Sequence, residues 1–206
     1  MLSKSVPALI FLALSATSSQ ALVWDQRGKP NTVTFSRGFS GLCTGCDMSN
    51  RPLDNARLSG GNFSASNFSG SHMRNAEMTG ANFASARFDR GDLSNSEMNG
   101  SNFSTSSFVG TGMRQIEATG SNFSRADFAG ADLTGADFVG ANLSAGRFAG
   151  TRGNDADFSG ANLTGAMFMG ATMRDPDFTG AIMTLDAMVH GGNTGGAQND
   201  IDAMFD

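Results

Sequence analysis

Six acidic residues recur at intervals of twenty in this 206-residue chain, and their spacing gives them the clearest capacity for chemistry. They are Glu77, Glu97, Glu117, Asp137, Asp157 and Asp177. If twenty residues make one turn of a coil, neighbouring carboxylates stack about 4.8 Å apart. A calcium ion takes carboxylate oxygens at about 2.3 to 2.6 Å and can bridge two such neighbours. The spacing therefore predicts weak binding of divalent cations.

The same acidic ladder has a simpler interpretation as a solvated surface. Stacked carboxylates repel one another by roughly 0.9 kcal/mol per neighbouring pair even at the dielectric constant of water. Arginines are placed to offset this repulsion, three of them three residues before a ladder acid and one twenty residues before Glu77. They are Arg74, Arg114, Arg174 and Arg57 respectively. We therefore expect local ion pairs along the ladder, with cation binding as its function if it serves more than solubility.

Two cysteines in the sequence Cys43-Thr44-Gly45-Cys46 form the second candidate site. Three interpretations compete: a disulfide formed in an oxidising compartment, two small buried thiols, or a redox or metal site. A zinc ion needs about four ligands, and the histidines, His72 and His190, lie far apart in the chain. A thioredoxin-type site needs a βαβ context that the sequence lacks. The disulfide and the buried thiols remain the main alternatives.

A five-residue repeat must position these side chains. Every fifth residue from Met48 to Met188 is Phe, Leu or Met, with the exceptions Ala118 and Gly153. A period of five is neither the 3.6 of a helix nor the 2 of a half-buried strand, so the chain must turn a corner in each repeat. Asparagine and glycine recur every twenty residues, as the acids do, which predicts four sides to each coil. The asparagines are Asn62, Asn82, Asn102, Asn122, Asn142 and Asn162.

The repeats resemble those of the pentapeptide-repeat family, whose A-(D/N)-L-x-x consensus occurs here three times. The matching triplets begin at Ala131, Ala141 and Ala161. The resemblance implies an all-β fold, a right-handed quadrilateral parallel β-helix of about seven coils, with Phe, Leu and Met along its axis. Of the two exceptions, Ala118 follows Ile116, so large and small residues have exchanged places and the volume is kept. Gly153 has no such exchange, and we expect a void or a pinched corner there.

Four segments are predicted. Residues 1–21 have the basic, apolar and small-residue regions of a cleavable signal peptide, which predicts a periplasmic or secreted protein. Residues 22–47 form an N-terminal cap that contains Trp24 and the two cysteines. Residues 48–188 are the β-helix. Residues 189–206 are a glycine-rich link and a C-terminal cap, in which we expect the last ten residues to form a short helix with Ile201, Met204 and Phe205 on one face. By the family resemblance, this segment is also a candidate dimer contact.

The sequence shows no recognisable catalytic set: it has no tyrosine, no nucleophile elbow and no phosphate loop. We predict no enzyme activity, no cofactor, and no transmembrane segment in the mature chain. The predicted function is that of an exported scaffold that binds an unknown protein or envelope component, with no nucleic acid as partner. The resemblance also offers an acidic rod that mimics DNA and binds DNA gyrase; the export signal argues against this alternative, because it removes the protein from gyrase.

Overall fold

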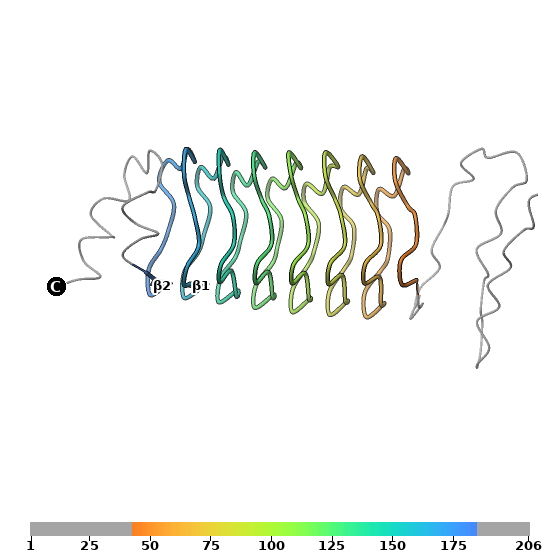
Figure 1. Ribbon diagram of the computed structural model, residues 1–206, viewed down its shortest axis with the longest axis horizontal. Coiled ribbons are helices and arrows are strands. Elements are labelled where there is room, and N and C mark those ends of the chain that lie inside the picture. Colours follow the sequence, from red (N-terminus) through yellow and green to blue (C-terminus); the bar gives the residue numbers. More distant parts are fainter. Residues whose placement is uncertain (1–42, 185–206) are drawn as a thin grey trace, which may run out of the picture.

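The computed structural model describes residues 43–184, which form a stack of four-sided coils along one axis (Figure 1). Each residue at the middle of a side pairs in parallel with the residue twenty positions later, from Asp47 with Asn67 to Asn162 with Ile182. The right-handed quadrilateral β-helix of about seven coils is therefore confirmed. The predictions for the signal peptide, the N-terminal cap before Cys43, the C-terminal cap and the dimer contact lie outside the described residues.

The sides of each coil are too short to form ordinary strands. Two strands of two residues each occur, β1 (Asn162–Leu163) and β2 (Ile182–Met183), and they pair in parallel. Elsewhere in residues 43–184 the sides meet through single bridges, and this part of the chain contains no helix. The backbone bonds are nevertheless regular: Phe63 N donates to Asn82 O at 2.7 Å, and Asn82 N donates to Gly61 O at 2.8 Å.

Every fifth residue has a positive φ angle, and this angle makes the corners. Gly60 has φ 69° and Arg125 has φ 60°. The corner at Arg125 is closed by a bond from Ala126 N to Phe123 O at 2.9 Å, and a positive φ at the third residue is what a type II turn requires. Glycine meets this requirement without strain, whereas other residues adopt it at a cost. Asparagine, which tolerates the conformation better than most, occupies the corners at Asn50, Asn55, Asn75 and Asn95.

Stacked phenylalanine rings fill the core on two adjacent sides. Phe83 stacks on Phe103 with ring centroids 5.0 Å apart, and Phe103 stacks on Phe123 at 4.9 Å. A second column runs beside the first and meets it with tilted or edge-on rings, as between Phe123 and Phe128 at 5.6 Å. Leu and Met occupy most of a third side, and on the fourth they give way to a further stack of Phe138, Phe158 and Phe178. The axis is continuous because rings in the middle of the described stack contact both neighbouring coils, as Phe128 does with Phe108 and Phe148.

The two exceptions to the repeat behave differently from one another. Ile116 and Ala118 are both buried, in agreement with the expected exchange of volume. The void expected at Gly153 is wrong, because a Cβ atom there would lie 3.2 Å from both Cε and Cγ of Met173. The methionine of the next coil therefore fills the space that the missing side chain leaves.

Polar side chains on small inward positions are satisfied by the backbone. Among the described residues, eight serines and threonines are buried. Each hydroxyl donates to a main-chain carbonyl, for example Ser101 Oγ to Met78 O at 2.6 Å and Ser106 Oγ to Phe83 O at 2.7 Å. Six of these bonds tie one coil to the corner of the coil before it, whereas those of Ser71 and Ser96 close their own corners. Within residues 43–184 no helix has the length and apolar character needed to cross a membrane.

Candidate functional site

The structure places the six ladder acids in one column on a single side of the rod. Consecutive members pair in parallel, from Glu77 with Glu97 through to Asp157 with Asp177. We call these six residues the acidic column. They are 6 of the 19 acidic residues in the chain. The predicted juxtaposition is therefore present, and neighbouring carboxylates belong to adjacent coils.

Each aspartate of the acidic column has one oxygen bound to its own corner. Asp137 Oδ1 accepts a hydrogen bond from Val139 N at 2.8 Å, and Asp177 Oδ1 accepts one from Thr179 N, also at 2.8 Å. Hydrogen bonds from the Thr179 hydroxyl and backbone N–H hold the pKa of Asp177 below its ordinary value. A cation that bridges two coils would therefore bind mainly the second oxygen of each aspartate.

The arginines expected to neutralise the acidic column mostly pair elsewhere. Arg57 does bind Glu77, with 3.1 Å between Nε and Oε1. Arg74 instead lies 3.5 Å from Asp54 and 3.6 Å from Asp92. Arg114 binds Asp132, and within the described part of the chain no ion pair joins Arg174 to the column.

The prediction of local ion pairs along the ladder is therefore wrong for these three arginines. Their position, two residues before an inward residue and three before the acid, puts them at a corner. From there the side chains of Arg74 and Arg114 reach aspartates on the side that precedes the acidic column. Among residues 43–184, Glu77 is the one member of the column with a salt bridge.

The part of the chain that the structure describes contains no group of three or more acidic, histidine or cysteine side chains placed to hold a metal ion. Binding by pairs of column carboxylates therefore stays a prediction. Such pairs would supply few ligands each, and calcium normally takes six to eight oxygens.

The next side along the chain is uncharged. Here the six asparagines of the repeat lie in a column, and Asn82 Nδ2 donates to Asn62 Oδ1 at 3.1 Å. The same Oδ1 atom accepts a bond from Ser64 N at 3.2 Å. The pattern repeats at Asn102 and Asn122. The amides thus bind to one another and to their own corners, which indicates a structural role for this side.

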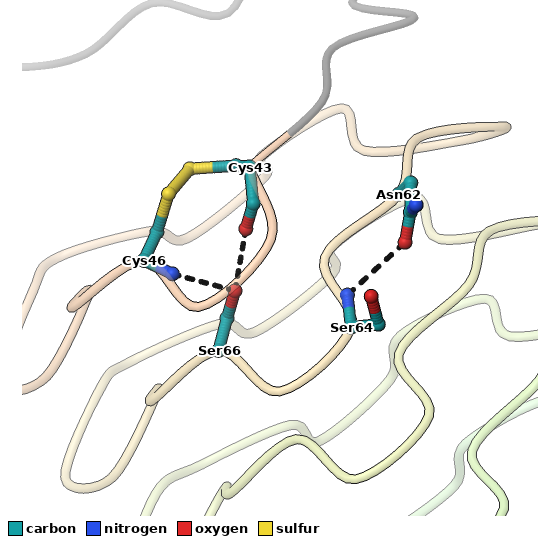
Figure 2. Close-up of a disulfide and its surroundings, with 5 residues drawn as sticks. All are labelled: Cys43, Cys46, Asn62, Ser64 and Ser66. Atoms are coloured by element: carbon teal, nitrogen blue, oxygen red, sulfur yellow. Dashed lines mark hydrogen bonds between the residues drawn. A yellow bond between two sulfur atoms is a disulfide. The ribbon is translucent and has the colours of Figure 1, made fainter.

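A disulfide joins Cys43 and Cys46 at the N-terminal end of the described stack (Figure 2). Their Cα atoms lie 5.5 Å apart across one corner, and both side chains pack partly buried against the core. Of the alternatives drawn from the sequence, the structure presents the disulfide.

Sequence reasoning missed the ion pairs on the side before the acidic column, which centre on Asp132. Its Oδ2 atom lies 2.7 Å from an Arg114 guanidinium nitrogen and 3.5 Å from Arg152, while its Oδ1 accepts the Thr134 hydroxyl proton at 2.7 Å. Burial of this carboxyl opposes its ionisation, but hydrogen bonds from Thr134 and Arg114 outweigh that effect and lower its pKa. The signal was available in the spacings of 18 and 20 residues between these partners.

Asp132→Asn is expected to destabilise the rod by about 1 to 2 kcal/mol at pH 7, because two guanidinium groups lose a charged partner. The lowered pKa means that ionised Asp132 stabilises the fold above the unfolded-state pKa of about 3.9, and this contribution is lost as the pH falls through the folded-state value. Urea unfolding at pH 7 and pH 3 measures both effects. Asp155→Asn, at an exposed corner, is the control, and an equal loss in both variants at pH 7 would contradict the assignment.

The model of the pentapeptide repeat family matches residues 53–90, 86–125, 113–144, 136–175 and 154–184. These segments run together over more than half of the chain. The chain belongs to the pentapeptide repeat family. A search of curated proteins gives no significant match.

Among solved structures, this pentapeptide repeat protein is similar to QnrB1, a plasmid-mediated fluoroquinolone resistance protein. The two share 17% identity over 70% of this chain and 93% of the other, with a TM-score of 0.42. HetL, involved in heterocyst differentiation regulation in the cyanobacterium Nostoc sp. strain PCC 7120, shares 23% identity over 68% of this chain and 80% of its own, with a TM-score of 0.29. A pentapeptide repeat protein from the cyanobacterium Cyanothece 51142 shares 14% identity over 70% and 88%, with a TM-score of 0.31.

Proposed function

We propose that this protein is an exported, non-enzymatic scaffold that binds a basic protein of the cell envelope along its acidic column. One observation supports this above the others: within residues 43–184, five of the six column carboxylates have no arginine partner. Residues 43–184 contain ten arginines, and most of those in ion pairs bind aspartates outside the acidic column.

An uncompensated row of charge costs stability, and a partner relieves that cost on binding. Neighbouring carboxylates repel by roughly 0.9 kcal/mol per pair. A basic surface placed against the column removes this repulsion and is attracted over about a Debye length, roughly 8 Å at physiological salt. The stacked axis holds the row straight, so that its charges are arranged before the partner arrives.

The test is a pull-down from the envelope fraction with tagged mature protein, comparing the parent with Glu97→Gln/Glu117→Gln. The matched control is Asp47→Asn/Asp127→Asn, which removes two charges from the opposite side of the coil. We expect the column variant to lose a partner that both the parent and the control retain. Equal retention by all three proteins would contradict a role for the column.

Export requires removal of residues 1–21, and the expected product begins Leu22-Val23-Trp24. The intact mass of protein recovered from the envelope fraction or the medium measures this directly. A full-length cytoplasmic species as the main product would overturn the proposed localisation. It would also restore the DNA-mimic alternative, for which a gyrase supercoiling assay with the mature protein is the direct measurement.

The acidic column is also expected to bind calcium weakly. At roughly millimolar affinity, 10 mM calcium should raise the melting temperature of the parent by about 3 to 5 °C, because the ion binds only the folded state. Glu97→Gln/Glu117→Gln/Asp137→Asn should not respond. Sodium at matched ionic strength is the control, and equal shifts in parent and variant would indicate general screening in place of binding.

A further inference from the structure

We propose that the Cys43–Cys46 disulfide is a redox-sensitive staple that holds the first described corner of the rod closed. The bond joins a large inward position to a small one across the corner (Figure 2). In later coils these two positions hold pairs such as Phe63 with Ser66 and Phe83 with Ala86. A covalent link therefore stands where the rest of the axis has packing between side chains.

The backbone of this corner differs from the corners stacked above it. In each of the six later corners of the same column, the residue in the small position donates its N–H to the carbonyl three residues before, as Ala86 does to Phe83 at 2.9 Å. Between Cys46 and Cys43 the Ser66 hydroxyl takes the place of that bond. Ser66 Oγ donates to Cys43 O at 2.6 Å and accepts from Cys46 N at 3.0 Å.

The stapled corner provides hydrogen-bond partners for the second coil. Cys43 N donates to Asn62 O at 2.8 Å, Gly45 N donates to Ser64 O at 2.8 Å, and Asn67 N donates to Cys46 O at 2.8 Å. The described stack ends here, so this corner has a described coil on one side only. The disulfide fixes the geometry from which these bonds start.

The staple is also accessible to a reductant. Thr44 and Gly45 are exposed, and both cysteines are only partly buried. A small dithiol transfers two electrons and two protons to the sulfur pair: the protein S–S bond breaks, two protein thiols form, and the dithiol closes its own disulfide. In a solenoid each coil contacts its neighbours alone, so loss of the staple should loosen the end and leave the middle intact.

Hydrogen exchange of the full mature chain, followed by mass spectrometry or NMR, tests the proposal with dithiothreitol as the reductant. We expect the amides of Gly45 and Asn67 to exchange on the order of tenfold faster after reduction, from the lost closure of a short loop. The amide of Phe123, in the middle of the axis, should not change. Cys43→Ser/Cys46→Ser should show fast exchange at the same two amides with and without dithiothreitol.

Three outcomes would overturn the proposal. The first is that protein purified without reductant has two thiols that can be alkylated, because the disulfide is then absent. Unchanged exchange at Gly45 and Asn67 after complete reduction shows that Ser66 and packing hold the corner by themselves. Faster exchange at Phe123 as well shows that the bond stabilises the whole rod, with no special role at its end.

Discussion

Replacing Phe123 with aspartate is expected to unfold the rod. Phe123 is fully buried, stacks on Phe103 with ring centroids 4.9 Å apart, and meets Phe108, Phe128 and Phe138 at 5.6 to 5.8 Å. Loss of a buried phenylalanine costs about 3 to 5 kcal/mol by itself. Burial of an unpaired carboxylate adds several more. The sum matches the whole stability of an ordinary domain, about 5 to 15 kcal/mol.

Thermal unfolding followed by far-UV circular dichroism measures this effect. Phe123→Leu is the matched control, because Leu143 and Leu163 fill the same column one and two coils further along the chain. We expect the leucine variant to lose about 1 kcal/mol. An aspartate variant that melts like the parent would show that position 123 does not face the axis.

Replacing Gly153 with leucine is expected to destabilise the protein, although the equivalent position in every other coil holds leucine or methionine. The reason is Met173, whose side-chain atoms lie 3.2 Å from the place that a Cβ at residue 153 would take. Overpacking of this kind costs about 1 to 3 kcal/mol, because the methionine or the backbone must move.

The double variant Gly153→Leu/Met173→Ala separates this explanation from a general intolerance of the position. If Met173 occupies the space, shortening it should recover much of the stability lost in Gly153→Leu, a coupling that a double-mutant cycle measures. Met173→Ala in the parent should be destabilising by about 2 kcal/mol or more, since it opens a cavity beside the glycine. Stabilisation by Gly153→Leu alone would show that an empty space was present after all.

The repeat made the fold predictable to a degree that most sequences do not allow. Each inward position was visible from its fifth-residue period, and the twenty-residue period of the acids placed Glu77 above Arg57 and below Glu97, as the structure has them. The stacking of like side chains was also predictable, because residues twenty positions apart lie directly above one another in adjacent coils. The acidic column was therefore found from sequence alone.

The predictions that were wrong concern where long side chains extend. The repeat period fixes the position of each backbone residue but not the direction of its side chain. Arg114 lies three residues before Glu117, yet its flexible chain leads to Asp132 on the other side of the corner. Met173 filled the space at Gly153 because methionine adapts to irregular gaps. The positive φ angles at Arg90 and Arg125 also give no sequence signal, since neither residue favours that conformation and the stack imposes it.

The positive φ at every fifth residue makes the five-residue side, and not the twenty-residue coil, the smallest unit that the chain can gain or lose. Deleting five residues keeps every later inward residue inward but turns the outward columns by a quarter of the circumference. The acids after the deletion would then continue the line of a different side. Deleting twenty residues shortens the rod and leaves each column straight. Insertions or deletions of whole coils therefore preserve the surface columns. Insertions or deletions of single sides keep the core but change which outward residues lie in the same column.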